Sequence, residues 1–474
     1  GGTSTSTATI NVAPVNDNPL AANDAGAVTE DNTLSVTAAN GVISSTAAPA
    51  GRDTDVDGDA LSVAAVRTGA EAATGTAGSV GVALAGTYGT LTLNDNGSYT
   101  YVASNANALA AGVTAKDVFT YTVTDGSKTD TAELVITVTG ANDTPVIAGV
   151  LPGVSGVDAL PVSIPTATGF ADPDTGDVLT FSASGLPAGL AIDPASGLIT
   201  GTLPANASVS GPYTITVIAT DPSGAHVAQT FQLGVSNPTP TANPDTLVIA
   251  ENATQGGNVI TGAGLGGDKA DTDPDHDSLT VTQVGTGSGT PATAVTAAGV
   301  TLTGEHGSLT IHADGSYTYA ATDNRLAANA TAVDTFSYTV SDGQGGTSTT
   351  TLTINLTGAN DAPTSGPSAA TTLEDTAYVL HAADFPFADV DTGDSLGAVR
   401  ITSLPTNGSL TLNGVAITGP VTVSAADLAA GNLSFVPDAN ENGLNYATFG
   451  YQVLDQNGGN APTQTFTVNV TPVA

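Results

Sequence analysis

The chain has 474 residues, of which 44 are acidic and only 7 are basic, so its formal net charge is −37 at pH 7. This charge excludes a surface for nucleic acid or anionic lipid and favours cations as partners. The sequence has no cysteine, which excludes disulfides and cysteine-held metals, and it has no apolar run of about 18 residues that could cross a membrane.

Short alternating segments predict β-strands along the whole chain. Apolar and polar residues alternate in Val118–Thr124, and this strand is expected to end in the tight turn Asp125–Gly126. Strands of the same kind are expected at residues 131–138, 213–219, 336–340 and 449–453. Several short strands per ~100 residues, separated by turn signals, are typical of β-sandwiches. The predicted fold class is therefore all-β, with sandwiches in tandem.

The chain also repeats itself. Residues 53–63, DTDVDGDALSV, return at 271–281 as DTDPDHDSLTV. Residues 96–101, NGSYTY, return at 314–319 as DGSYTY with the same offset. A constant offset indicates one type of module that is present twice, with another module between the two copies.

Module boundaries are expected at joints that combine Asn or Asp with Pro. Proline fixes φ and restricts the residue before it, so each joint is predicted to be short and stiff. Residues 1–13 are similar to the expected strand at 345–356, and are predicted to be the last strand of a preceding repeat in a natural protein that continues upstream. Four β-sandwich modules, one to four, are then expected at residues 14–143, 144–237, 238–361 and 362–474.

Modules one and three resemble the VCBS repeats of large secreted bacterial adhesins. The resemblance rests on DTDVDGDALSV, GTLTLNDNGSYTY, FTYTVTDG and VTGANDTP in module one, and on their counterparts in module three. Module two resembles putative-Ig, dystroglycan-type cadherin-like domains through FADPDTGDVLTFSASGLPAGLAIDPASGLITGTLP and YTITVIATDPSG. Module four resembles bacterial cadherin-like repeats through LEDTAYVL, DVDTGDSL, FVPDANENG and FGYQVLDQNGG.

This resemblance implies Ig- or cadherin-like sandwiches in an extended row, as part of a repeat-in-toxin (RTX) type adhesin at the bacterial cell surface. The row would be a calcium-stiffened stalk that supports adhesion or biofilm formation. Its partners would be neighbouring repeats of the same polypeptide, with no nucleic acid and no direct insertion into a membrane.

Acidic residues gather in one segment of each module. In modules one and three, four aspartates stand at alternate positions, which would place them on one face of an extended segment. Their carboxylates repel one another unless a cation lies among them, and Ca²⁺ prefers about six to eight oxygen ligands of this kind. The predicted calcium ligands of these segments are Asp53, Asp55, Asp57, Asp59, Asp271, Asp273, Asp275 and Asp277, with the counterparts Asp172, Asp174 and Asp177 in module two and Asp389, Asp391 and Asp394 in module four.

A second set of predicted ligands lies near the joints, where the resemblance to cadherin-like repeats implies an interdomain ion. At the first joint the implied group is Asn16 and Asp17 with Glu30 and Asp55 or Asp57. At the last joint the implied group is Asn360 and Asp361 with Glu374 and Asp391. Asp143 and Glu251 are further candidates at the joints between. Module two has no early acid except Asp158, so no full site is expected at its first joint, which is predicted to be the most flexible.

Other interpretations compete with these. Asp125 and Asp342 stand in Asp-Gly turns, where aspartate is ordinary turn chemistry. The acids recur at matching positions and no nucleophile-elbow pattern is present, so the chain is not expected to be an enzyme. One alternative function is a subunit of an extracellular fibre or surface layer, in which residues 1–12 add to the sheet edge of a like chain. The other alternative is a carbohydrate-binding module.

Overall fold

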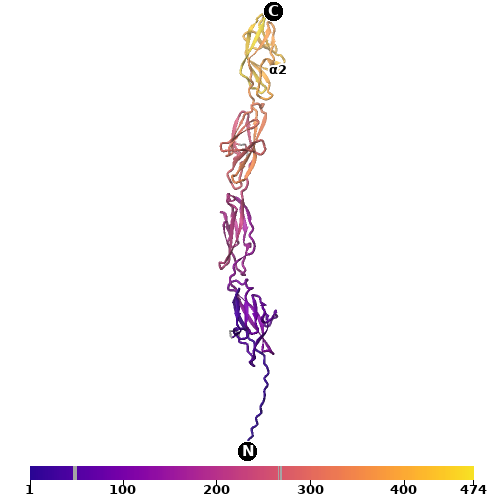
Figure 1. Cartoon of the computed structure of the whole chain (residues 1–474). Helices are drawn as coiled ribbons and strands as arrows, with labels where there is room; N and C mark the ends of the chain where they lie inside the picture. Colours follow the sequence, from indigo (N-terminus) through magenta and orange to yellow (C-terminus); the bar gives the residue numbers. More distant parts are fainter. Residues whose placement is uncertain (46–50, 265, 267–268, 474) are drawn as a thin grey trace. The chain divides into compact units, whose positions relative to one another are not determined.

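The structure is a computed structural model that describes residues 1–45, 51–264, 266 and 269–473, so the last residue of the predicted fourth module lies outside the described part. Strands, drawn as arrows, are the predominant regular element and helices are few and short (Figure 1). The chain divides into two compact units, Gly1–Ser236 and Asn237–Ala474. The predicted all-β class with tandem sandwiches is confirmed.

Module one is built from two sheets. The larger sheet has the strand order β1 (Asp24–Thr29), β9 (Thr129–Thr139), β8 (Thr114–Thr124), β3 (Ser62–Thr68) and β4 (Ala77–Gly78). The smaller sheet has the order β2 (Thr33–Val36), β7 (Tyr99–Val102), β6 (Thr90–Leu93) and β5 (Leu84–Ala85). A short 3-10 helix, η1 (Ala38–Asn40), follows β2.

Module three repeats this arrangement strand for strand. Its larger sheet has the order β19 (Asp245–Ala250), β27 (Thr347–Thr357), β26 (Thr331–Ser341), β21 (Thr280–Thr286) and β22 (Thr293–Ala294). Its smaller sheet has the order β20 (Thr254–Asn258), β25 (Ser316–Ala321), β24 (Gly307–Ile311) and β23 (Val300–Thr303). The sequence repeat therefore corresponds to a repeat of the fold.

Module two is smaller and is divided differently. One sheet has the order β11 (Val154–Val157), β18 (His226–Ser236), β17 (Tyr213–Thr220) and β14 (Thr180–Ser184). A second sheet has the order β12 (Pro161–Pro165), β16 (Leu198–Thr202) and β15 (Leu190–Ile192). The remaining elements are the pair β10 (Val146–Ile147) and β13 (Phe170–Ala171), the 3-10 helix η2 (Ala167–Gly169) and the α-helix α1 (Ala207–Ser210).

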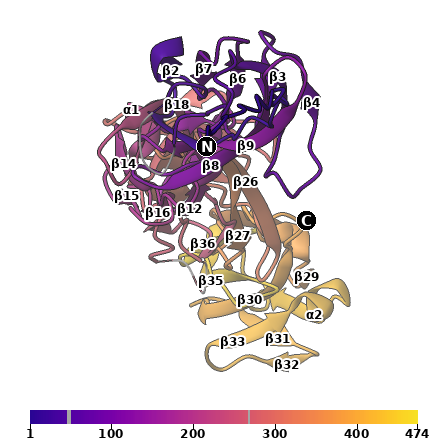
Figure 2. The same cartoon turned by 90° about the horizontal axis from the view of Figure 1, so that it is seen from below.

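Module four again has a five-stranded and a four-stranded sheet. The first has the order β28 (Ser368–Leu373), β36 (Gln464–Thr471), β35 (Gly443–Asp455), β30 (Leu396–Ser403) and β33 (Val421–Ser424). The second has the order β29 (Tyr378–Val379), β34 (Leu433–Val436), β31 (Ser409–Leu412) and β32 (Val415–Ala416). The 3-10 helix η3 (Ala382–Asp384) follows β29, and α2 (Ala425–Ala429) lies beside β30 and β33 (Figure 2).

Each module buries its own apolar cluster between its sheets. In module one, Phe119, Tyr121 and Val123 alternate along β8 and are at most 1% exposed. They meet Leu134 and Ile136, which alternate along the neighbouring β9. Alternation with a period of two places these residues on one face, as the sequence predicts. The burial of each such side chain contributes about 1.5–3 kcal/mol to folding.

In each module an early strand (β1, β11, β19 or β28) pairs in parallel with the last strand, and this pairing positions the residues of interest. Thr29 at the end of β1 lies opposite Thr139 at the end of β9. The backbone N–H of Glu30 then donates to the carbonyl of Thr139 at 3.0 Å. Glu30 therefore lies at the exit end of module one, meaning the end where the last strand finishes and the chain passes to the next module. Glu251, Glu374 and Asp158 occupy the same position in the other modules, bonded to Thr357, Thr471 and Ser236.

Residues 1–13, predicted to be a last strand, form no strand in the structure. Ile10 and Val12 are 84% and 85% exposed. The matching residues of module three, Ile354 and Leu356, are fully buried in β27. The apolar side chains of this N-terminal segment thus have the pattern of a sandwich strand without a sheet to cover them.

Candidate metal centre

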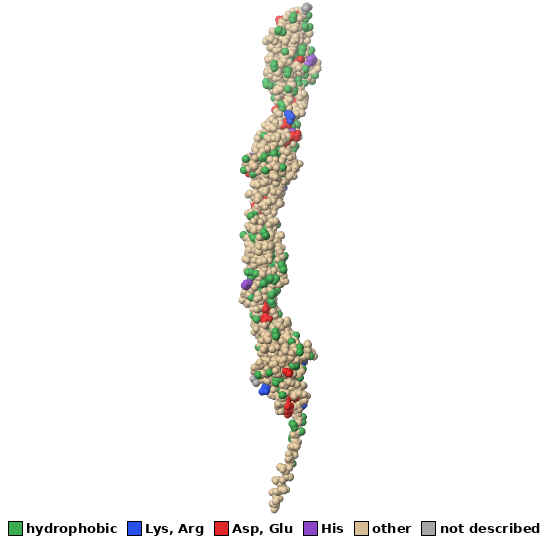
Figure 3. All heavy atoms as spheres, viewed as in Figure 1, with side chains coloured by type: hydrophobic (Ala, Val, Ile, Leu, Met, Phe, Trp, Pro, Cys, Tyr) green, Lys and Arg blue, Asp and Glu red, His purple; other side chains and the backbone are tan. Residues whose placement is uncertain are grey.

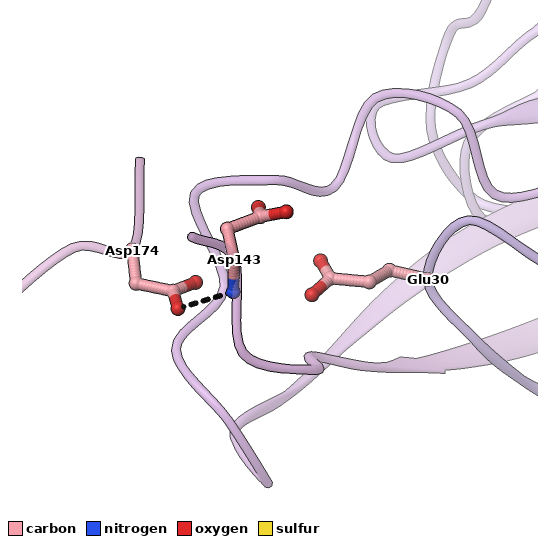
Figure 4. A group of neighbouring side chains, drawn as sticks. All are labelled: Glu30, Asp143 and Asp174. Atoms are coloured by element: carbon pink, nitrogen blue, oxygen red, sulfur yellow. Dashed lines mark hydrogen bonds between the residues drawn. The ribbon is translucent and has the colours of Figure 1, made fainter. Parts of the chain in front are cut away.

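Three carboxylates meet where module one passes to module two (Figure 4). Glu30 follows β1, Asp143 lies in the joint, and Asp174 lies in the loop after β13. One oxygen from each lies within 4.8 Å of the others. Glu30 and Asp174 are only 2% exposed. Asp172, Asp174 and Asp177 form an adjoining group with the same spacing, so Asp174 is common to both.

In this centre a carboxylate uses one oxygen to hold the backbone and leaves the other without a hydrogen-bond donor. Glu30 accepts the N–H of Ala141 through Oε1, and Asp174 accepts the N–H of Asp143 at 2.9 Å through Oδ2. Asp172 accepts the N–H of Asp174 at 3.0 Å through Oδ1. The remaining oxygens, and Oδ2 of Asp143, are buried without a partner. The backbone thus fixes a set of anionic oxygens that face one another.

The joint between modules three and four reproduces this arrangement atom for atom. Glu251 Oε1 accepts the N–H of Ala359 at 2.6 Å, and Asp391 Oδ2 accepts the N–H of Asp361 at 3.0 Å. The other oxygens of Glu251 and Asp391, and Oδ2 of Asp361 and Asp389, are buried without a donor. Two groups again share one aspartate, with the members Glu251, Asp361 and Asp391 in one and Asp389, Asp391 and Asp394 in the other.

The electrostatics of both centres are unfavourable without a cation. Burial, followed by the charges of Asp143 and Asp174, raises the pKa of Glu30. Burial, followed by the charges of Asp361 and Asp391, likewise raises the pKa of Glu251. In the described part of the chain, side-chain ion pairs occur only at Asp323, which contacts His306 and Arg325. No lysine or arginine described in the structure therefore forms an ion pair with these carboxylates. Acidic side chains far outnumber basic ones on the face drawn in Figure 3.

The donor set fits calcium. Ca²⁺ binds carboxylate and carbonyl oxygens at about 2.3–2.6 Å, so two ligands on opposite sides of the ion are about 4.6–5.2 Å apart. Oxygens that lie within 4.8 Å of one another satisfy this limit. Buried anionic oxygens without donors are also costly unless a cation pairs with them.

A further feature of the joints recurs in all four modules and was not anticipated from the sequence. The side chain of the joint asparagine donates to an aspartate in the turn before the last strand. The pairs, with their distances, are Asn16–Asp125 at 2.8 Å, Asn142–Asp221 at 2.9 Å, Asn237–Asp342 at 2.8 Å and Asn360–Asp455 at 3.1 Å. The turn role predicted for Asp125 and Asp342 is present too, because their Oδ1 atoms accept backbone N–H groups of the turn. The recurring Asp-Gly or Asp-x-x-Gly turn was the available sequence signal.

Replacement of Asp221 by alanine tests this link. Asp221 is 4% exposed and accepts the N–H groups of Ser223, Gly224 and Ala225 at 2.7–2.9 Å in addition to Asn142. We expect Asp221→Ala to lower the free energy of unfolding of module two, because the side chain of Asn142 and several turn N–H groups lose their common acceptor. Urea unfolding in the presence of a chelator measures this. Asp193→Ala, in an exposed turn of the same kind without a joint contact, should cost less.

Several predicted ligands lie elsewhere than expected. Glu30 was grouped with Asn16 and Asp17, but it lies with Asp143 and Asp174 at the other end of the module. Glu374 was grouped with Asp361, a place that Glu251 occupies. Glu374 instead accepts the N–H of Val473 at 2.9 Å and the side chain of Asn442 at 2.8 Å, at the exit end of module four.

The four alternating aspartates of module one do not share one face. Residues 53–59 form a turn in which the N–H groups of Asp57 and Asp59 both donate to Asp55 Oδ1, at 2.8 and 3.3 Å. Asp53 turns into the core and contacts the hydroxyl of Tyr121 at 3.3 Å. In module three, Asp271 is likewise separate from the group of Asp273, Asp275 and Asp277.

The first joint, before module one, has some of the features of the other two centres. The N–H of Asp17 donates to Asp57 Oδ2 at 2.7 Å, and Asp55 Oδ2 is buried without a donor. The second joint differs from the expectation of an incomplete site, since it holds the group of Glu30, Asp143 and Asp174. The acidic residue early in each module lies at the exit end of that module, beside the joint that follows it. The lack of such a glutamate in module two therefore affects the joint after module two and not the joint before it.

Comparison with known proteins places the fold in a family. The model of the bacterial cadherin-like domain matches residues 16–140 and 237–358, which together exceed half of the chain. The chain belongs to the bacterial cadherin-like family. Between and after its two cadherin-like modules, residues 144–236 match a putative Ig domain and residues 360–471 match a bacterial Ig domain. Module four, predicted as cadherin-like, thus matches an Ig model, while the finer resemblance to VCBS repeats and RTX adhesins stays a prediction.

Solved structures similar to this cadherin-like chain include animal cadherins. Drosophila N-cadherin EC1-4 is 14% identical, with 95% of this chain and 98% of that chain covered and a TM-score of 0.29. The protocadherin GammaB4 extracellular domain is 14% identical, with 96% and 66% covered and a TM-score of 0.33. The human desmocollin-1 ectodomain is 12% identical, with 96% and 80% covered and a TM-score of 0.29. None of the curated proteins matches the chain.

Proposed function

We propose that the chain is a calcium-stiffened extender segment of a bacterial cell-surface adhesin, which holds a binding domain away from the cell and supports adhesion or biofilm formation. It acts outside the cell, and its direct partners are the neighbouring repeats of the same polypeptide. The described helices are too short to cross a membrane. The net charge of −37 disfavours nucleic acid as a partner.

One observation carries the proposal. At two joints, matching carboxylates from two successive modules leave matching oxygens buried, close together and without donors. Glu30 belongs to module one and Asp174 to module two, so an ion between them is bound by both. The same holds for Glu251 and Asp391 in modules three and four. A cation held in this way restrains the joint as well as the modules.

The chain itself holds the ligand oxygens in place. Backbone N–H groups of Ala141 and Asp143 fix the carboxylates of Glu30 and Asp174 before any ion arrives. Calcium, when bound, supplies the positive charge that cancels their repulsion. Because the ion binds only when both modules are folded, binding also stabilises them by mass action. The acids recur at joints rather than in one cleft, which supports a mechanical role and no enzyme activity.

Small-angle scattering and thermal unfolding of the full chain test the proposal. In calcium we expect a larger and better-defined maximum dimension, and a higher melting temperature, than in an excess of chelator. Magnesium at the same concentration is the control, since it is smaller and dehydrates reluctantly. Equal maximum dimensions and equal melting temperatures with and without calcium would refute the proposal.

A second candidate function follows from the exposed N-terminal segment. Ile10 and Val12 lack the sheet that covers their counterparts in β27. We propose as an alternative that this segment adds to a sheet of a like chain and builds a fibre or surface layer. Light scattering at rising protein concentration tests it, with Ile10→Ser and Val12→Ser expected to abolish assembly. A wild-type chain that stays monomeric at all concentrations would count against this alternative.

A further inference from the structure

The two modules of each compact unit are also joined by a hydrogen bond between backbone groups. The N–H of Thr175 in module two donates to the carbonyl of Ala108 in module one at 3.2 Å. The N–H of Thr392 in module four donates to the carbonyl of Arg325 in module three at 3.0 Å. Each bond lies within one unit. Neither bond involves a carboxylate, so neither depends on a cation.

The accepting carbonyls lie at matching places in the two cadherin-like modules. We call the segments before β8 and β26, residues 103–113 and 322–330, the exit loops. Each exit loop is tied to the end of the last strand of its own module. In module one the N–H of Gly112 donates to the carbonyl of Gly140 at 2.9 Å, and the matching bond in module three is 3.0 Å long. Each exit loop thus presents a carbonyl at a fixed place to the module that follows.

The donating N–H belongs to the residue that follows the central aspartate of each acidic loop. In modules one and three this residue is Gly58 or His276, and its N–H donates to the carbonyl of the first aspartate of its own loop at 3.2 Å. In modules two and four this residue is Thr175 or Thr392, and its N–H donates to the exit loop of the preceding module. Both threonines are exposed residues, so the contact runs through the backbone.

A one-residue insertion accounts for the difference. The acidic loops of modules one and three read DVDGD and DPDHD, and those of modules two and four read DPDTGD and DVDTGD. Gly176 and Gly393 in the longer loops have φ of 100° and 85°, which other residues rarely adopt. The longer turn closes one residue later, because the N–H of the last aspartate donates to the carbonyl of the central one at 3.3 and 3.2 Å. The N–H of the threonine is thereby left for an acceptor outside the loop.

Ion pairs fix the exit loop of module three. Asp323 accepts Nε and the backbone N–H of Arg325 at 3.0 and 3.2 Å, and it lies 2.9 Å from Nδ1 of His306. The hydrogen bonds from His306 and Arg325 lower the pKa of Asp323 to about 2. In module one a neutral bond takes this place, from the side chain of Asn105 to the carbonyl of Thr87 at 2.7 Å. The carbonyl that meets module four therefore belongs to a residue whose side chain is anchored in module three.

We infer that the exit loop of a cadherin-like module is a docking surface for an Ig-like module with the longer acidic loop, and that the two recognise each other without an ion. The N–H of the inserted threonine is the donor, and Asp323 is a positioning residue at the joint between modules three and four. The inference goes beyond the proposed function, because the contact requires no cation. Calcium would then act at a joint that is already aligned.

Hydrogen exchange of the full chain in an excess of chelator, followed by mass spectrometry, tests the inference. The amides of Thr175 and Thr392 should exchange more slowly than in the unfolded chain. Asp323→Ala should accelerate exchange in residues 389–395 of module four by roughly threefold to tenfold, because one hydrogen bond is weakened. Exchange in residues 172–178 of module two should not change. A role of Asp323 confined to the stability of module three would not alter exchange in module four alone.

Asp314→Ala is the matched control for this variant. Asp314 accepts the N–H of Ser316 at 3.0 Å in the turn between β24 and β25, so the control removes a turn aspartate from the same module. It should leave exchange in residues 389–395 as it is in the wild type. Thermal unfolding in chelator verifies that every variant is folded.

The reverse variant changes the acidic loop of module four. Thr392→His together with deletion of Gly393 gives the loop DVDHD, which has the length and the aspartate spacing of the loop in module three. The N–H of residue 392 should then close its own loop. Exchange in residues 322–328 of module three should accelerate, because the loss of a shared contact acts on both of its sides.

The outcomes separate this inference from the proposed function. A chain that binds no calcium but keeps slow exchange at both threonines would refute the proposed function and support the inference. Exchange at Thr392 as fast as in the unfolded chain, in a folded wild type in chelator, would overturn the inference. The same conclusion would follow if Asp323→Ala and Asp314→Ala gave equal exchange in residues 389–395.

Discussion

Glu251→Gln is expected to weaken calcium binding at the joint between modules three and four by roughly tenfold to a hundredfold. Glutamine keeps an oxygen for the N–H of Ala359, so the local backbone should persist. The substitution removes one negative charge and turns a buried ligand oxygen, Oε2, into a weaker amide group. The calcium-dependent rise in melting temperature should shrink accordingly. Calorimetry and thermal unfolding, each with calcium and with chelator, measure the two effects.

In chelator the same variant should melt no lower than the wild type. Burial raises the pKa of Glu251, so the ionised side chain costs stability when no cation is near. Glu305→Gln is the matched control, because Glu305 is exposed, lies in the same module and belongs to none of the metal groups. An equal loss of calcium affinity in both variants would point to net charge alone rather than to a ligand.

The strands of the fold could be predicted well from alternation and turn signals. Val118–Thr124 lies within β8, and the predicted turn at Asp125–Gly126 contains a glycine with φ of 102°, which other residues rarely adopt. Strand pairing across the module was not predictable in this way. It depends on contacts between segments far apart in the chain, such as β1 with β9.

The grouping of Glu30 shows why the site was harder to predict than the strands. Glu30 is close in sequence to the joint at Asn16, which made that joint the natural expectation. The intervening strand β1 carries the chain along the length of the module, and its parallel pairing with β9 leaves Glu30 beside Thr139. Sequence proximity was therefore misleading, and the direction of a single strand decided which joint the acid serves.

The aspartate segments illustrate a second limit. A period of two places side chains on one face only if the backbone is extended. Residues 53–59 instead fold around Asp55, because its carboxylate accepts two backbone N–H groups in an aspartate turn. An aspartate side chain can accept backbone N–H groups in place of a neighbouring strand, and an alternating sequence pattern does not reveal this. It separates Asp53, in the core, from Asp57, at the joint.

The stability of the chain is expected to depend differently on pH with and without calcium. Burial raises the pKa of Asp24 to about 6 and, together with the charge of Asp24, raises that of Asp53 to about 7. The hydroxyl of Tyr121 has one proton for both, at 3.0 Å from Asp24 and 3.3 Å from Asp53. Burial raises the pKa of Asp271 in module three to about 6.

The direction in which stability changes with pH follows from which state binds protons more tightly. The folded state binds them more tightly, because an aspartate in the unfolded chain has a pKa near 3.8. Stability from these groups is fully present below the unfolded value and is lost as pH rises through about 6 to 7. In chelator the melting temperature should therefore fall between about pH 4 and pH 8, with most of the loss below about pH 7. In calcium it should fall less or rise, because ligands such as Glu30 must lose their protons before they bind the ion.

Asp53→Asn isolates the contribution of the buried pair. Asparagine keeps an acceptor for the N–H of Ala22, which lies 2.8 Å from Asp53, and its amide can donate to Asp24. In chelator at about pH 8 we expect the variant to gain on the order of 2–4 kcal/mol of unfolding free energy, and to lose most of the pH slope of module one. Thermal and urea unfolding across this pH range measure both quantities.

Asp117→Asn should behave in the opposite way, although Asp117 is buried in the same module. Asp117 accepts the N–H groups of Thr87 and Tyr88 at 2.8 and 3.0 Å, and the hydroxyl of Tyr101 at 2.6 Å. An amide with a single acceptor oxygen leaves at least one of these donors unsatisfied, which costs about 1–3 kcal/mol at every pH. If Asp53→Asn instead destabilised the chain as Asp117→Asn does, or retained the wild-type pH slope, the protonated carboxyl pair would not be the source of the pH dependence.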